Sequence, residues 1–278
     1  MTGQLWLVST PIGNLGDLPP RAVATLQACA LICCEDTRHS GKLLSHAGVS
    51  GVRLAIANEH TEDARATEVL DLLAAGHDVA VLTDAGTPGI SDPGARLVRA
   101  AIAAGYRVSA VPGPAALVMG LVLSGFDTTR FVFEGFLPRS GKDRKERIAE
   151  IARERRTIVL YEAPHRVQRT VADLLAACGP ERQIALAREL TKLHEETWRG
   201  DLAAAAAHVA ETAPRGEYVL VIEGAPAVVV SATDEAIGEA LRMALAGGAD
   251  RRTAIATVTA STGATKRRVY DLALTIPR

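Results

Sequence analysis

The sequence predicts an α/β protein with two α/β domains and a smaller helical segment at its C-terminal end. Short apolar runs alternate with helical patterns through the first 115 residues. A second set of apolar runs begins near Arg130 and ends at Gly224, and residues 227–278 show helical periodicity alone. Alternation of this kind is typical of a mostly parallel sheet covered by helices.

The first domain, residues 1–120, is expected to hold the parallel sheet. Its strands are the apolar runs Leu5–Ser9, Leu31–Cys34, Leu54–Ala57, Val79–Thr83 and Val108–Val111. The helical stretches "RAVATLQACA" and "ARATEVLDLLAAG" lie between them, and each ends near a glycine or a polar turn.

The second domain, residues 121–226, begins after a break around "LSGFDTTR". Its expected strands are "RFVFEGF", "TIVLYEA", "QIALARE" and "EYVLVIEG", and the alanine run at 203–207 marks a helix. Residues 227–278 are expected to form a small helical, helix-turn-helix-like module with a turn at Gly263. A length of 278 residues also favours two domains over one.

Composition narrows the class of protein. The formal net charge is −1, so any contact with nucleic acid has to come from local patches. The cysteines at 29, 33, 34 and 178 show no metal-ligand spacing, which predicts no metal and a reduced, intracellular environment. The start "MTGQLWLVST" is no signal peptide, and no apolar run approaches the ~20 residues that span a bilayer. We therefore expect a cytoplasmic protein without a membrane partner.

Polar or Gly/Pro-rich residues follow each expected strand of the first domain. They are Ser9-Thr10-Pro11, Glu35 to His39, Asn58-Glu59-His60, Thr83 to Gly86 and Pro112-Gly113-Pro114. Ligands of open α/β sheets bind outside the carboxyl ends of the strands, so these exits predict a binding site. The alternative is that they are ordinary polar connections.

The segment "LTDAGTPGISDPG", Leu82 to Gly94, predicts a shaped loop in this site. Its glycines permit a close backbone approach and its prolines stiffen the path, which suits a backbone-lined pocket for a small polar cofactor. The sequence has no G-x-G-x-x-G, phosphate-loop, H-E-x-x-H or G-x-S-x-G motif. Asp84 and Asp92 either contact the ligand or cap a local turn, and Asp92-Pro93 is interpreted as the start of the next helix.

A set of ordered motifs resembles one known family. The motifs are "STPIGNLGDLPPRA", "CEDTRHSGKLL", "LTDAGTPGISDPG", "VPGPAA", "FEGFLPR", "LYEAPHR", "ARELTKLHEE" and "GEYVLVIEG". In order and spacing, from Leu5 to about Gly224, they are similar to the bacterial small-subunit ribosomal RNA methyltransferases. These enzymes methylate a cytidine 2′-oxygen in the decoding region of 16S rRNA and belong to the tetrapyrrole-methylase-like class.

The resemblance implies a fold, a cofactor and a set of site residues. It implies two α/β domains with S-adenosyl-L-methionine in the cleft between them, and a homodimer. Ala115 departs from the serine that is usual in the family, which puts one side-chain contact in doubt. The residues implied to bind the cofactor are Pro11, Gly13, Asp84, Gly86, Thr87, Pro88, Gly89, Ile90, Pro112, Gly113, Pro114, Ala115, Ala116, Tyr161 and Glu162.

Methyl transfer to a hydroxyl depends mainly on in-line geometry, and a general base adds about 10²–10⁴-fold to the rate. The candidates for this base are Glu35 and Asp36, with Arg38 and His39 placing a phosphate or the ribose. The alternative is that Glu35 and Asp36 cap the helix that begins near Thr37.

Two basic segments are candidates for RNA contact. One follows "FLP" and contains Arg139, Lys142, Arg144 and Lys145; the other opens the last helix with Lys266, Arg267 and Arg268. The alternatives are a solvated helix face and a helical cap. Two rival functions keep the fold: a small-molecule, tetrapyrrole-type methylase and a non-catalytic RNA-binding factor.

Overall fold

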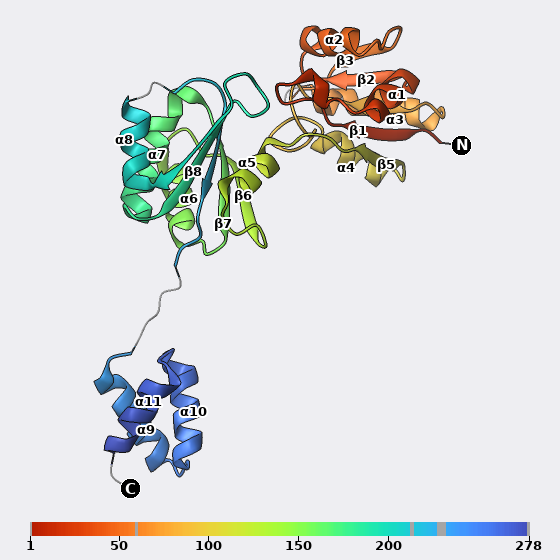
Figure 1. Cartoon of the computed structure of the whole chain (residues 1–278). Coiled ribbons are helices and arrows are strands. Elements are labelled where there is room, and N and C mark those ends of the chain that lie inside the picture. The colour runs from red at the N-terminus through yellow and green to blue at the C-terminus, as the bar shows by residue number, and fades with distance from the viewer. Residues whose placement is uncertain (1, 59–60, 212–213, 227–231, 277–278) are drawn as a thin grey trace. The chain divides into compact units, whose positions relative to one another are not determined.

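The computed structural model describes residues 2–58, 61–211, 214–226 and 232–276 (Figure 1). The chain forms two compact units, residues 1–225 and residues 226–278, and the first unit contains two five-stranded sheets. The α/β class with a helical C-terminal segment is therefore confirmed. The predicted domain limit at residue 120 stays a prediction; this residue lies inside a helix, Ala116–Ser124.

The first sheet is parallel throughout, with the strand order β3-β2-β4-β1-β5. Its strands are β1 (Gln4–Val8), β2 (Leu31–Cys34), β3 (Arg53–Ile56), β4 (Val79–Val81) and β5 (Arg107–Val111). These bounds agree with the expected runs to within a residue or two at each end. The parallel arrangement follows because a helix crosses over between successive strands.

Helices cover both faces of this sheet. They are α1 (Pro20–Ala28), α2 (Thr37–His46), α3 (Glu62–Ala74) and α4 (Ala95–Ala103), with a short 3-10 helix η1 (Leu15–Asp17). Successive strand residues alternate between the faces: Leu31 and Cys33 pack with α3 and α4, while Ile32 and Cys34 pack with α1 and α2. Burial on both faces explains why the strands are short continuous apolar runs.

The second sheet is mixed, with the order β6-β7-β10-β8-β9 and one parallel pair, β6 and β7. Its strands are β6 (Phe131–Phe136), β7 (Thr157–Glu162), β8 (Gln183–Arg188), β9 (Glu196–Asp201) and β10 (Tyr218–Ile222). The sequence predicted four of these runs and missed β9. This strand, "ETWRGD", is a polar edge strand that no continuous apolar pattern marks.

Four helices pack on the second sheet: α5 (Ala116–Ser124), α6 (Gly141–Arg153), α7 (Pro164–Cys178) and α8 (Leu202–Glu211). The last three bury one face of the sheet, and α5 lies on the other. Ile12, from the loop after β1, is buried with α5 and with Leu190 after β8. The loops of the first sheet therefore pack directly against the second sheet.

The C-terminal unit consists of α9 (Asp234–Ala246), α10 (Arg251–Thr262) and α11 (Lys266–Thr275). Thr233, Asp250 and Thr265 cap these helices with side-chain oxygens, and Gly263 makes the expected turn with φ +64°. Ile237, Val258 and Val269 belong to its own buried core. Among the described helices of the whole chain, none is long and apolar enough to cross a membrane.

Candidate functional site

A cavity of about 550 Å³ opens at the carboxyl ends of β2, β4 and β5, where the second sheet faces them. This is the position that the polar strand exits predicted. The residues around it are Ile12, Glu35, Asp84, Ala85, Gly86, Thr87, Ile90, Ser91, Asp92, Ala115, Ala116, Leu117, Phe136, Tyr161, Glu162, Ala163, Pro164, His165, Glu189, Leu190, Lys192, Glu217, Tyr218 and Val219.

The loop after β4 forms one wall of the cavity. A short backbone bridge ties it to the loop after β1: Thr10 N–H donates to the Gly86 carbonyl at 2.9 Å, and Gly86 N–H returns a bond of 3.2 Å. Gly86 and Gly89 both have φ +84°, and Ser91 has φ +60°. A non-glycine residue in this region carries backbone strain that the surroundings must hold in place.

The start of α4 is capped from a distant part of the chain. One carboxylate oxygen of the buried Glu62, in α3, accepts the backbone N–H groups of Gly94, Arg96 and Leu97 at 2.9–3.0 Å. The helix begins at Ala95 with no side-chain bond from its own N-cap. The interpretation of Asp92 as the helix start is therefore wrong, and Asp92 lies on the cavity wall instead.

Three carboxylates of the first sheet line the cavity: Glu35, Asp84 and Asp92. Burial, followed by the charges of Glu35, Asp84 and Glu217, raises the pKa of Asp92 to about 7. Burial, followed by the charges of Asp84 and Asp36, also raises the pKa of Glu35. The Oδ1 atom of Asp84 is buried and has no hydrogen-bond partner among the described residues. The cavity is therefore strongly receptive to positive charge.

Aromatic side chains of the second sheet form the opposite wall. The Tyr161 hydroxyl accepts the backbone N–H of Leu117 at 3.0 Å, and its ring lies 4.9 Å from Phe133 and 5.7 Å from Phe136, measured between centroids. Burial raises the pKa of Tyr161, which stays protonated. The Phe136 side chain is 51% exposed at the cavity.

Glu162 lines the cavity, but its carboxylate is bound to neighbouring residues of the fold. It is 1% exposed, and its carboxylate accepts the Ala163 N–H at 3.0 Å and the Thr170 hydroxyl at 2.6 Å. Arg166 pairs with it at 3.0 Å. Both carboxylate oxygens therefore have partners within the fold, and these bonds fix the start of α7.

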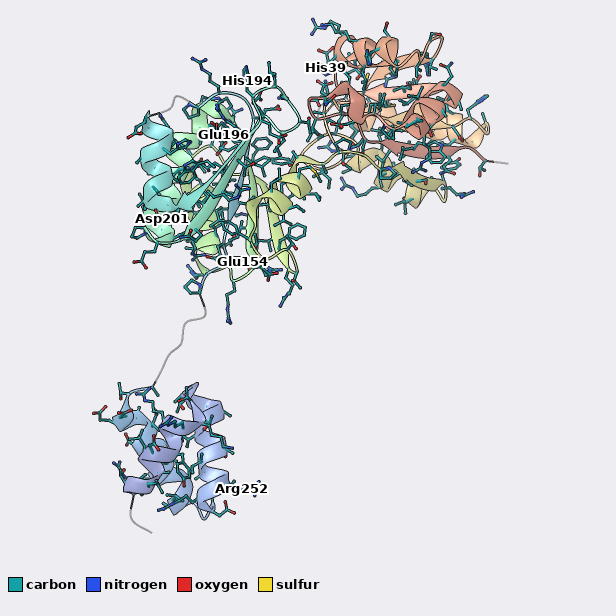
Figure 2. The ribbon with its side chains drawn as sticks, viewed as in Figure 1. His39, Glu154, His194, Glu196, Asp201 and Arg252 are labelled. Atoms are coloured by element: carbon teal, nitrogen blue, oxygen red, sulfur yellow. The ribbon has the colours of Figure 1, made fainter. Side chains whose placement is uncertain are left out.

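Lys192 is the cation of the cavity wall. Its ammonium lies 2.9 Å from Glu189 and 3.1 Å from Glu217. Burial alone would lower the pKa of Lys192, but the bonds to Glu189 and Glu217 outweigh it and raise that pKa. The backbone of this β8–β9 loop is held in the left-handed region at Glu189 (φ +49°) and Thr191 (φ +66°), and the same loop carries His194 (Figure 2).

Some of the residues that were predicted to bind the cofactor line the cavity, and the others do not. The predicted residues on its wall are Asp84, Gly86, Thr87, Ile90, Ala115, Ala116, Tyr161 and Glu162. Those that lie off the wall are Pro11, Gly13, Pro88, Gly89, Pro112, Gly113 and Pro114. Sequence reasoning missed Phe136, Glu189, Lys192 and Glu217, although the motifs "FEGFLPR", "ARELTKLHEE" and "GEYVLVIEG" contain them.

Of the four residues that were predicted to act in catalysis, only Glu35 lines the cavity. Glu35 lines the cavity, while Asp36 is the N-cap of α2, accepting the Arg38 N–H at 2.8 Å. The side-chain bond from Arg38 and its backbone bond lower the pKa of Asp36 to about 2. Asp36 is thus a helix cap and a poor proton acceptor, which corrects the expectation. Arg38 is exposed on α2. His39, the next residue of that helix, is exposed as well (Figure 2).

The basic residues that were predicted to contact RNA differ in their exposure. Arg144 is 3% exposed, and its guanidinium donates to Asp173, the Pro138 carbonyl and Thr170 at 2.9–3.0 Å. Its assignment to RNA contact is wrong, because the side chain is buried and its guanidinium is bonded within the fold. The exposed candidates are Arg139, Lys142, Lys145, Lys266 and Arg267, and Arg268 pairs with Asp234 at 2.7 Å. Among the described residues, no His, Cys, Asp and Glu cluster could hold a metal ion.

Comparison with known proteins adds independent information. The family model described as tetrapyrrole (corrin/porphyrin) methylases matches residues 4–206. A Synechocystis protein named ribosomal RNA small subunit methyltransferase I is 46% identical over 273 residues, covering 98% of each chain. The Escherichia coli O157:H7 protein of the same name is 44% identical over 224 residues, 80% of this chain and 78% of the relative.

Solved structures resemble the first unit at lower identity. The methyltransferase CobJ aligns with a TM-score of 0.61 at 20% identity, over 81% of this chain and 95% of that one. Uroporphyrin-III-C-methyltransferase from Thermus thermophilus aligns with a TM-score of 0.54 at 21% identity, over 81% and 94%. At these identities the likeness concerns the fold alone.

Proposed function

The chain belongs to the tetrapyrrole (corrin/porphyrin) methylase family, and we propose that it methylates the 2′-hydroxyl of a cytidine ribose in the decoding region of 16S rRNA. It is an S-adenosyl-L-methionine-dependent methyltransferase. One observation supports RNA as the methyl acceptor. The chain is 46% identical, over both of its units, to a relative named ribosomal RNA small subunit methyltransferase I. The two solved structures named above are 21% and 20% identical to this chain.

The cavity fits the methyl donor. S-adenosyl-L-methionine supplies a methyl group on a sulfonium, and it carries a second positive charge on its amino group. Asp84 offers a buried oxygen without a partner among the described residues, which is the group that such a cation would satisfy. The backbone of Gly86, Thr87, Ala115 and Ala116 borders the same space. Because contacts there come from the main chain, the missing hydroxyl at Ala115 leaves them in place.

The residues behind the wall support this pocket. Pro11, Gly13 and the segment Pro112 to Pro114 belong to the loops after β1 and β5, and Pro88 and Gly89 belong to the loop after β4. Ile90 and Tyr161 contribute apolar surface to the cofactor. Glu162 acts through the start of α7, as its bonds to the fold require.

RNA would be held by exposed basic residues outside the cavity. Arg139, Lys142 and Lys145 lie before and on α6, and Lys266 and Arg267 open α11. Arg38 and His39 are exposed on α2, which starts directly after the cavity residue Glu35. Phosphate contacts of this kind position a strand without reading its sequence. The acidic cavity admits the ribose and repels the phosphates.

We propose that the active form is a cytoplasmic homodimer with α5 at its interface. Val118, Met119, Val122 and Leu123 are exposed by 37–60%, although α5 is apolar almost all round. An apolar stripe of this kind on a soluble protein marks a contact surface. Val122→Asp should convert the dimer to a monomer in light scattering, whereas Ile102→Asp, at an equally exposed site on α4, should not. A monomeric wild-type protein would contradict the proposal.

The function is tested by transfer of labelled methyl groups. The purified protein is incubated with methyl-labelled S-adenosyl-L-methionine and one of three acceptors: small subunits lacking the modification, deproteinised 16S rRNA, or uroporphyrinogen III. Label on one cytidine 2′-oxygen of the rRNA is expected. Label on the tetrapyrrole instead would contradict the RNA acceptor, and cofactor binding without transfer to any acceptor would favour a binding-only role.

A further inference from the structure

We propose that Asp92 accepts the proton of the ribose hydroxyl during methyl transfer, an assignment that rests on the function proposed above. Asp92 lies on the cavity wall between the first sheet and the aromatic wall of the second. Burial and the charges of neighbouring carboxylates act on its side chain, and no hydrogen bond from a described residue does. A carboxylate placed in a cleft without a structural partner is a candidate for chemistry.

The surrounding chain holds Asp92 in this position. Glu62 caps α4 and so takes over the role that Asp92 would otherwise have. On the other side, a Cβ atom built on Gly135 would lie 3.3 Å from the Ser91 hydroxyl oxygen, so the irregular turn of β6 presses against the loop. Ser91, with φ +60°, carries backbone strain that its surroundings must hold in place, and it directly precedes the cavity residue Asp92.

Three other carboxylates of the cavity are already bound within the fold, and a fourth fits the methyl donor. Glu162 is bound to Thr170 and Arg166, and Glu189 and Glu217 are bound to Lys192. Asp84 has the buried oxygen that fits the positive charge of the donor. Glu35 remains as a neighbour whose charge acts on Asp92.

The groups that face Asp92 determine when it can take a proton. Glu35 after β2, Asp84 after β4 and Glu217 before β10 add negative charge, and burial adds to their effect, so its pKa is about 7. Tyr161 on β7 stays protonated, and the cavity also contains His165 and the paired Lys192. A general base works best when its pKa lies near the working pH.

The step balances in atoms and electrons. The ribose hydroxyl gives its proton to a carboxylate oxygen of Asp92, and its oxygen forms the new bond to the methyl carbon. The carbon–sulfur bond of the donor breaks, and sulfur keeps that electron pair. Asp92 leaves the step as a neutral carboxylic acid and releases the proton to water.

The test compares Asp92→Asn with wild type and with Asp71→Asn, which removes an exposed carboxylate from α3. Single-turnover methyl transfer to small subunits is measured between pH 5.5 and 9, and cofactor affinity by calorimetry. Wild-type transfer should fall as the pH drops through about 7. Asp92→Asn should lose this acid limb and about 10²-fold or more of the rate, with cofactor affinity changed less than about threefold. Asp92→Glu should restore part of the rate.

A second readout does not depend on turnover. Carboxyl carbon resonances of the free protein, compared between wild type and Asp92→Asn, should reveal one group that titrates near pH 7. An unchanged rate and pH profile in Asp92→Asn would overturn the assignment of Asp92 alone. A wild-type enzyme that methylates no RNA would instead overturn the proposed function. A loss explained wholly by weaker cofactor binding would make Asp92 a binding residue and contradict its role as proton acceptor.

Discussion

The Glu62 carboxylate accepts a hydrogen bond of 3.0 Å from the backbone N–H of Gly94, and through this bond the start of α3 fixes the start of α4. The same oxygen also accepts from Leu97 at 3.0 Å. These bonds fix the chain where the loop after β4 enters α4. Asp92, in the same loop, lines the cavity. Structural and chemical roles are therefore divided between two acids that lie far apart in the sequence.

Loss of this cap should destabilise the first unit. Glu62→Gln keeps one acceptor oxygen but removes the charge. We expect the free energy of unfolding to fall by about 1 kcal/mol or more, because a hydrogen bond to a charged group contributes about 1.5–3 kcal/mol and a neutral one about 0.5–1.5 kcal/mol. Both tryptophans, Trp6 and Trp198, belong to the first unit, so their fluorescence in urea follows its unfolding. Asp63→Asn breaks only an exposed pair with Arg96 and should cost less than about 1 kcal/mol. Equal losses in the two variants would contradict the cap.

The raised pKa of Asp92 predicts a pH-dependent stability. Folding raises this pKa from 3.8 to about 7, so the folded state holds the proton more tightly than the unfolded chain. The resulting stabilisation is complete below pH 3.8 and is lost as the pH rises to about 7. Asp92→Asn should remove this decline and should gain on wild type between pH 5 and pH 8. Parallel curves in urea unfolding at several pH values would contradict the shift.

The neighbours Arg144 and Lys145 should separate stability from RNA binding. Arg144→Ala removes the buried guanidinium that donates to Asp173, Thr170 and the Pro138 carbonyl, and should cost about 2 kcal/mol or more. Lys145 is exposed, so Lys145→Ala should change stability by less than about 0.5 kcal/mol. It should instead weaken binding to small subunits and reduce the salt slope by about 1. An unchanged slope would exclude Lys145 from the RNA contact.

Phe136 should bind a planar ring. It is 51% exposed at the cavity, next to Tyr161, and stacking on such a ring contributes about 1–3 kcal/mol. Phe136→Ala should weaken either the cofactor or the RNA acceptor by about 5- to 150-fold, and separate measurements of cofactor Kd and acceptor KM identify which. Phe131→Ala is the control, since Phe131 lies on the same strand, is 39% exposed and does not line the cavity. Two unchanged constants would rule the contact out.

The sequence by itself determined much of the architecture. Mainly apolar runs separated by helical patterns identified each strand of the parallel sheet, because helices bury both of its faces. The edge strands β3 and β5 keep exposed polar positions at Arg53 and Arg107. Their polar exits located the cavity, since parallel strands bring their carboxyl ends to one edge. The edge strand β9 was not predicted from the sequence, because its residues "ETWRGD" contain no continuous apolar run.

Only the tertiary structure decided which of two neighbouring residues lies on the cavity or the surface and which one supports the fold. Glu35 lines the cavity while Asp36 caps α2, and Lys145 is exposed while Arg144 is buried. Adjacent side chains point in different directions, and the direction depends on where a helix begins and what packs against it. The sequence predicted that Asp92 begins the next helix. In the structure, Glu62, thirty residues earlier in the chain, caps α4 instead. A contact between such distant residues is set by the packing of helices, which local sequence patterns do not encode.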